Sequence, residues 1–222
     1  MSEKYMAERE VKYNSFGVFR TVILFILTLL FTILTYYVIS DTDLYWDRYI
    51  SDKLQSERYL SFNGLMRGLS YFGNVPFAFS AIVITSLIFY LFKKKREAFL
   101  MLSTMLTGII SWILKMMIDR PRPTADLVKI FEETNYKSFP SGHVLFYTVF
   151  FGFLSIICFH AQRISIPIKR TLIVFLIIIL FLSAASRIYL GAHWFTDILG
   201  GFIIGIQFLI IGEFLYARKS DE

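Results

Sequence analysis

Runs of mostly apolar residues, each close to twenty residues long, recur along the whole chain and constrain its fold more than any other feature. A hydrocarbon core about 30 Å thick is crossed by about 20 residues of α-helix, which satisfies its own backbone hydrogen bonds. Six such runs cover residues 21–39, 76–92, 98–118, 144–160, 171–190 and 195–216. The sequence therefore predicts an all-α integral membrane protein with six transmembrane helices.

Composition supports this class, because 56% of the 222 residues are hydrophobic, a larger share than in a typical soluble domain. The net charge of +6 comes from short basic clusters between the apolar runs, so nucleic acid is not an expected partner. The single cysteine, Cys158, lies inside an apolar run and is interpreted as a packing residue. Without an internal repeat or an appended soluble region, residues 1–222 are expected to form one domain.

The basic clusters also predict the orientation in the membrane, because short loops rich in Lys and Arg remain in the cytoplasm. They alternate with the runs and comprise Lys4, Arg9, Lys12, Arg20, Lys93, Lys94, Lys95, Arg96, Arg163, Lys169, Arg170, Arg218 and Lys219. Both termini, including the segment 1–20, are therefore expected in the cytoplasm. Segments 40–75, 119–143 and 191–194 are expected on the outer side.

The outer segment 40–75 mixes aromatic and aliphatic side chains with charged ones. The residues that carry this pattern are Tyr45, Trp46, Tyr49, Tyr59, Phe62, Leu65, Met66 and Leu69. A helix in the membrane interface has this composition and could cover a site or guide a lipid toward it. A connector that only covers helix ends is an equally good interpretation.

A first polar constellation, from Lys115 to Pro123, stands at the outward end of the third run. Pro121 and Pro123 are expected to stop the helix, so that Lys115 and Arg122 direct two cations toward one point. Cations at helix ends also extend toward lipid headgroups, and this alternative is equally good for the segment alone.

A second constellation, Phe139-Pro140-Ser141-Gly142-His143, stands directly before the fourth run and is expected to start its helix. A helix N-terminus offers unpaired backbone N–H groups to an anion, to which Gly142 permits close approach and Ser141 adds a hydroxyl. His143 could then exchange a proton with the bound group. Taken alone, a plain helix cap at Ser141 beside an interfacial histidine explains the segment better.

A third constellation, Ser186 to Asp197, spans the turn between the last two runs. His193 and Asp197 are four residues apart, so on a helix the carboxylate can bind one imidazole nitrogen and leave the other as a nucleophile or base. Arg187 adds a cation that needs an anionic partner at this depth. A local His–Asp hydrogen bond would explain the pair but would not explain the arginine.

The predicted topology places all three constellations on one side at similar depth, and their order resembles that in a known family. Lys-x6-Arg-Pro, Pro-Ser-Gly-His and Ser-Arg-x5-His-x3-Asp are similar to the three signatures of the type 2 phosphatidic acid phosphatase family, in its membrane lipid phosphatase branch. Every signature position between residues 115 and 197 is matched. The third histidine, His160, falls at the opposite helix end and is expected to take no part.

The resemblance implies a phosphohistidine mechanism without metal or other cofactor. His193 would be the nucleophile, Asp197 would orient it, and His143 would act as general acid and then base. Phosphate would be bound by a set of polar groups that the signatures supply, namely Lys115, Arg122, Ser141, Gly142 and Arg187.

A site at the ends of membrane helices requires an amphiphilic substrate, and phosphatidate, phosphatidylglycerol phosphate and undecaprenyl diphosphate all qualify. The expected protein is a multi-pass enzyme of a bacterial inner or plasma membrane whose site faces the periplasm or exterior. A lipid phosphotransferase and a non-catalytic headgroup binder or transporter remain alternatives, whereas the six runs argue against vanadate-dependent halide oxidation. The sequence does not indicate an oligomeric state.

Overall fold

The structure, a computed structural model, describes residues 3–40, 45–56, 62–134 and 136–218, with side chains from residue 17 to residue 217. This part of the chain is helical and contains no strand. Its helices are α1 (Glu3–Ser40), α2 (Tyr45–Leu54), α3 (Asn63–Tyr71), α4 (Val75–Leu91), α5 (Lys95–Ser103), α6 (Leu106–Ile118), α7 (Gly142–His160), α8 (Ile166–Tyr189) and α9 (Phe195–Arg218).

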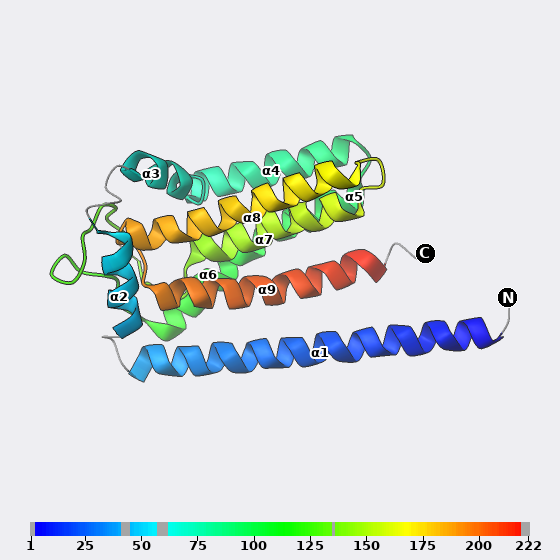
Figure 1. Cartoon of the computed structure of the whole chain (residues 1–222), viewed down its shortest axis with the longest axis horizontal. Coiled ribbons are helices and arrows are strands. Elements are labelled where there is room, and N and C mark those ends of the chain that lie inside the picture. The colour runs from blue at the N-terminus through cyan, green and yellow to red at the C-terminus, as the bar shows by residue number, and fades with distance from the viewer. Residues whose placement is uncertain (1–2, 41–44, 57–61, 135, 219–222) are drawn as a thin grey trace.

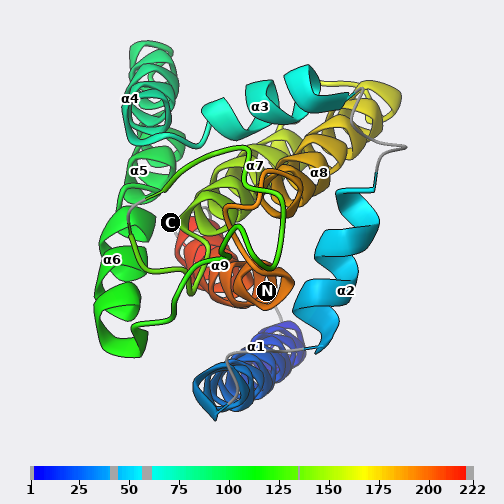
Figure 2. The same ribbon diagram turned by 90° about the vertical axis from the view of Figure 1, so that its left-hand side faces the viewer.

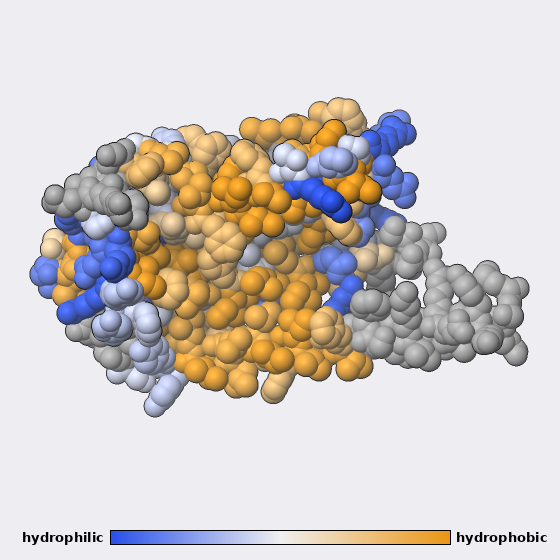
Figure 3. Space-filling view, viewed as in Figure 1, coloured by the Kyte–Doolittle hydropathy of each residue, from blue (hydrophilic) through white to orange (hydrophobic). Residues whose placement is uncertain are grey.

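Five stretches of helix are long and apolar enough to cross a membrane: Gly17–Ser40, Lys95–Ile118, Gly142–His160, Ile166–Tyr189 and Phe195–Ala217. A sixth crossing is formed when α3 and α4, which meet at an angle of 58°, are counted together. Exposed apolar side chains form a broad band between polar ends (Figure 3). The predicted all-α membrane fold is therefore confirmed, with the third run divided into α5 and α6 and the second preceded by a bend.

The basic turns lie at one end of the bundle and the predicted site lies at the other (Figure 1). The α4–α5 and α7–α8 connections share their end with the start of α1 and the end of α9. Helix α1 begins at Glu3, so most of the predicted N-terminal segment 1–20 continues the first membrane helix. The side chains of Lys4, Arg9, Lys12 and Arg218, and the whole of Lys219, lie outside the described residues.

Helix α7 is the centre of the bundle and packs against α6, α8 and α9 (Figure 2). Its buried side chains form the main core together with Ile82, Leu100 and Met101 from α4 and α5. Glycines of α9 allow the close approach to α7. A Cβ atom added at Gly201 would lie 2.8 Å from the backbone oxygen of Ser141.

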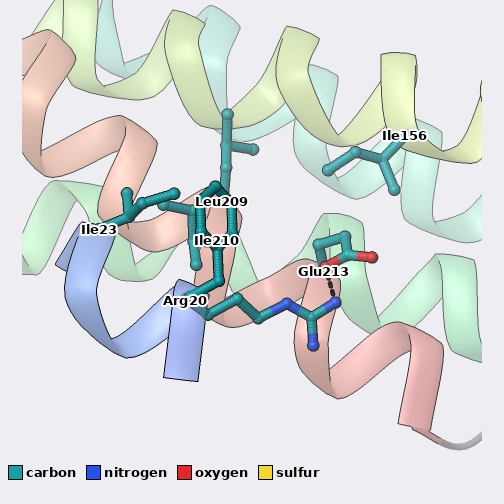
Figure 4. A pocket seen from close by; sticks show the side chains of 7 residues that line it. Arg20, Ile23, Ile156, Leu209, Ile210 and Glu213 are labelled. Atoms are coloured by element: carbon teal, nitrogen blue, oxygen red, sulfur yellow. Dashed lines mark hydrogen bonds and ion pairs between the residues drawn. The ribbon is translucent and has the colours of Figure 1, made fainter. Parts of the chain in front are cut away.

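Helix α1 lies on the outside of the bundle and is joined to α9 by polar contacts. Arg20 and Glu213 form an ion pair at 2.8 Å, and Gln207 donates to Thr28 at 2.8 Å. Both residues of the ion pair line a pocket of about 390 Å³ between α1, α7 and α9 (Figure 4). None of the predicted site residues lines it.

The outer segment 40–75 contains two short helices, α2 and α3, and α2 lies across the end of the bundle (Figure 1). Tyr45, Trp46 and Tyr49 of α2 are exposed, as expected of a helix in the membrane interface. Its inner face buries the polar residues Asp47 and Ser51 against α8 and α9, and Ile50 and Leu54 beside them pack on a buried apolar cluster. Tyr59, another residue of the expected pattern, lies outside the described residues.

The close packing of α9 on the start of α7 predicts a specific sensitivity at Gly201. The added Cβ of Gly201→Ala would meet backbone atoms of Ser141 and Leu145, so we expect a loss of stability of about 1–3 kcal/mol. Gly108→Ala is the control, because nothing lies within 4 Å of its added Cβ. Thermal unfolding of both variants in detergent measures the difference, and equal midpoints would contradict the packing.

Candidate active site

The three polar constellations meet at the end of the bundle that carries α2 (Figure 2). The first occupies the last turn of α6 and the loop that follows, the second the start of α7, and the third the end of α8 with the turn into α9. In Figure 2 the 119–141 loop passes over the ends of α7 and α9. The predicted site residues therefore come from separate helices that are held together by the core of α7.

His193 and Asp197 form the predicted pair, although His193 lies in the turn before α9 rather than on a helix. The Nδ1 atom of His193 is 3.1 Å from the Oδ2 atom of Asp197, and both residues are buried. Asp197 Oδ2 also accepts the backbone N–H of Trp194 at 2.9 Å and the hydroxyl of Ser138. These contacts fix the carboxylate, which in turn orients the imidazole.

The other imidazole nitrogen, Nε2 of His193, lies 3.4 Å from an Nη atom of Arg122. A guanidinium donates hydrogen bonds and does not accept them, so this contact favours a lone pair on Nε2 and a proton on Nδ1. Burial, followed by the nearby charges of Lys115 and Arg122, lowers the pKa of His193 well below its usual range. The ring is therefore neutral near pH 7, with the nitrogen that faces the cations unprotonated.

Helix α6 ends at Ile118. Lys115 reaches the site from the last turn of this helix, and Arg122 reaches it from the loop that follows. Pro121 and Pro123 follow that end, as predicted from the sequence. Arg122 donates to the backbone oxygen of Ala192 at 2.5 Å, and Lys115 donates to that of Ser138 at 3.1 Å. Burial lowers the pKa of Arg122 to about 10, so its guanidinium remains charged at neutral pH.

Arg187 comes from the last turn of α8 and is 1% exposed. One of its terminal nitrogens lies 3.0 and 2.9 Å from the carboxylate oxygens of Glu132 and also donates to the hydroxyl of Ser70. Its buried Nε has no hydrogen-bond partner among the described residues. The arginine is therefore paired with a half-exposed loop carboxylate and keeps one donor unused.

Ser141 and Gly142 begin α7 as the sequence predicted. Ser141 is the N-cap, and its hydroxyl accepts the N–H of Val144 at 3.5 Å. Its own N–H donates to the backbone oxygen of Asp197 at 3.0 Å, which joins the second constellation to the third. The start of α7 consequently lies beside the His193–Asp197 pair.

His143 follows in the first turn of α7 and contacts the bend between α3 and α4. Its Nε2 atom lies 3.2 Å from the side-chain oxygen of Asn74. A Cβ atom added at Gly73 would come within 2.2 Å of the imidazole, so only glycine permits this approach. His160, as expected, lies at the far end of α7 and is exposed.

Several residues of the site were missed by the sequence reasoning. Arg120, inside the first constellation, donates to Asp197 at 2.5 Å and to Asp47 of α2 at 2.6 Å, and all three side chains are buried. Ser70 and Asn74 come from the α3–α4 bend. The spacing of Asp47, Ser51 and Gln55 would have identified the inner face of α2, because residues four apart share one face of a helix.

Comparisons with known proteins agree with this arrangement. The model of the PAP2 superfamily matches residues 96–219. Phosphatidylglycerophosphatase B of Bacillus subtilis (strain 168) is 32% identical over 155 residues, which cover 68% of this chain and 74% of that protein.

The crystal structure of a transmembrane PAP2 type phosphatidylglycerolphosphate phosphatase from Bacillus subtilis matches with a TM-score of 0.74 and 26% identity. That match covers 89% of this chain and 96% of the other. The crystal structure of Aquifex aeolicus LpxE matches with a TM-score of 0.57 over 79% of this chain and 97% of the other, and at 22% identity it supports the fold alone. The chain belongs to the PAP2 superfamily.

Proposed function

We propose that this chain, a membrane lipid phosphatase of the PAP2 superfamily, removes phosphate from a lipid headgroup through a phosphohistidine formed on His193. One observation carries the proposal. The Nδ1 atom of His193 is held by buried Asp197 while its Nε2 atom faces the Arg122 guanidinium, a donor that favours an unprotonated Nε2. A nucleophile oriented by a carboxylate and surrounded by cations is suited to attack on a phosphate.

Binding of the phosphate is assigned to the five groups that the sequence predicted. Lys115, Arg122 and Arg187 supply positive charge, and the unused Nε–H of Arg187 supplies a donor. The start of α7 adds backbone N–H groups and the Ser141 hydroxyl. Donors fixed in this way stabilise the charge that spreads over the equatorial oxygens during phosphoryl transfer.

In the first step Nε2 of His193 attacks phosphorus, and a P–N bond forms as the P–O bond to the lipid breaks. The Nδ1 proton stays hydrogen-bonded to Asp197, which stabilises the positive charge on the imidazole. Protonated His143 gives its proton to the leaving oxygen, so the lipid departs as an alcohol or, from a diphosphate, as a monophosphate.

In the second step a water molecule gives a proton to His143 and attacks the same phosphorus. The P–N bond breaks, which releases inorganic phosphate and returns His193 to its neutral form. Asn74, at 3.2 Å from the imidazole, keeps His143 oriented through both steps. His143 thus acts as an acid in the first step, where it donates a proton, and as a base in the second step, where it accepts one.

The two alternatives differ from this function in what they require of the site. A headgroup binder needs the cations but has no use for a histidine oriented by a buried carboxylate. A phosphotransferase would use the same phosphohistidine with a lipid hydroxyl in place of water. The similar Bacillus proteins are phosphatases by name, which favours hydrolysis.

Their names also make phosphatidylglycerol phosphate the first candidate substrate, with phosphatidate and undecaprenyl diphosphate next. The site stands at the end of the bundle away from the basic turns, so the positive-inside rule supports a periplasmic or exterior site in a bacterial inner or plasma membrane. A lipid phosphate can reach the site there while its tail remains in the membrane.

Phosphate release by the purified protein tests this function. We expect release from at least one of these three lipids and full activity in excess chelator, because three cations stand where a metal ion would otherwise bind the phosphate. His193→Ala is the inactive control. Loss of activity that magnesium restores would contradict the three-cation site, and transfer of labelled phosphate to a second lipid would identify a phosphotransferase.

A second prediction concerns Glu132, because its carboxylate is paired with a terminal nitrogen of Arg187 to which a phosphate would also bind. Removal of this negative charge in Glu132→Gln should strengthen anion binding by roughly three- to tenfold, a range discounted for the partial exposure of Glu132. The inhibition constant of inorganic phosphate measures the change.

Glu133→Gln is the matched control, because Glu133 is exposed and lies next to Glu132 in the loop. We expect its inhibition constant to equal that of the unmodified protein. If Glu132→Gln binds phosphate more weakly, Glu132 holds Arg187 in its binding position and does not compete with the anion.

A further inference from the structure

A buried chain of charges joins the interface helix α2 to the nucleophile. Arg120 lies between two carboxylates, with Asp197 Oδ1 at 2.5 Å and Asp47 Oδ2 at 2.6 Å. The three side chains are 3%, 0% and 2% exposed, respectively, so water screens none of these contacts. The sequence signatures include Asp197 alone of these three residues.

Thr196 closes the network around the start of α9. Its backbone N–H donates to Asp47 Oδ1 at 2.8 Å, and its hydroxyl lies 2.8 Å from Asp47 Oδ2. Arg120 also donates to that hydroxyl at 2.7 Å. Asp47 therefore supplies, from α2, a negative charge that stabilises the N-terminus of α9. The residue next to Thr196 in this first turn is Asp197.

The charges in this network explain why Arg120 needs two partners. If Arg120 paired with Asp197 alone, it would neutralise the carboxylate on which the imidazolium of His193 depends. Because Asp47 shares the guanidinium, the two carboxylates and Arg120 together leave one negative charge for the imidazolium. A buried ion pair is costly to break when one partner is removed, so the three side chains form one unit.

We propose that Asp47 and Arg120 are positioning residues for the reaction, which set the orientation and the effective charge of Asp197 and through it the reactivity of His193. The proposal rests on the proposed function, because it assumes that His193 is the nucleophile. It assigns α2 a role beyond covering helix ends. The same helix carries exposed Tyr45, Trp46 and Tyr49 on its outer face and Asp47 on its inner face.

A role through charge can be separated from a role in folding by the pH dependence of the reaction. The charged or titratable groups that act on His193 are Lys115, Arg120, Arg122, His143, Arg187 and Asp197. His193 attacks when neutral, so activity falls as the pH decreases through its pKa. Loss of the Arg120 charge raises that pKa, so the acid limb of the pH–activity profile moves to higher pH. Loss of the Asp47 charge lowers the pKa, so the acid limb moves to lower pH.

The experiment compares Asp47→Asn, Arg120→Gln and the double variant with Asp52→Asn, whose side chain is exposed on the same helix. Activity on dioctanoyl phosphatidylglycerol phosphate in detergent micelles gives kcat and KM across the pH range. If the unmodified protein releases no phosphate from this or the other two lipids, the proposed function fails and not this inference alone.

With active unmodified protein, we expect each single variant to lose roughly 10- to 100-fold in kcat with KM changed by less than about twofold. The acid limbs should move in opposite directions, and Asp52→Asn should match the unmodified protein. Single variants that match Asp52→Asn, or that lose kcat without any shift of the limb, overturn the proposal.

The double variant keeps the test valid if a single variant fails to fold, because both buried charges are then removed together. It should unfold at a higher temperature than either single variant, with its acid limb near that of the unmodified protein. Its kcat should remain at least tenfold low, since Asp197 lacks its donor. Full activity in the double variant would overturn the proposal.

Discussion

The rest of the site depends on the hydrogen bonds and the ion pair that stabilise the Asp197 carboxylate. This carboxylate is fully buried at the end of a membrane bundle and is stabilised by donors from His193, the Trp194 backbone, Ser138 and Arg120. Such a charge is tolerated only when every oxygen has a partner. The 119–141 loop, the turn before α9 and helix α2 all contribute to this requirement, directly or through Arg120. The site is consequently rigid where the imidazole must be oriented.

Much of the fold was predictable because the membrane imposes a length on each helix. The apolar runs located the spans, and the α4–α5 and α7–α8 connections, where two of the predicted basic clusters fall, lie at the same end of the bundle. The break between α5 and α6 and the 58° bend between α3 and α4 were missed, because hydropathy does not register where a helix is interrupted or bent. The α3–α4 bend matters for the site, since it brings Asn74 and Ser70 to His143 and Arg187.

The site was predictable where chemistry is encoded by short spacing, as in the contact of His193 with Asp197 and in the cap at Ser141. It was not predictable where partners are far apart in sequence. Arg120 and Asp47 are 73 residues apart, and their contact depends on how α2 crosses the bundle end. Arg120 was passed over because Arg122, two residues later, filled the signature position. The orientation in the membrane and the roles of the site residues remain predictions.

The most direct test of the central claim is covalent labelling of purified variants with a radioactive phosphate ester that has a good leaving group. We predict acid-labile, base-stable label on the unmodified protein and none on His193→Ala. His143→Ala should accumulate label, because such a leaving group needs little protonation whereas release of phosphate still needs the base. Label on His193→Ala, or label that maps to Ser141, would contradict the assignment of His193 as the nucleophile.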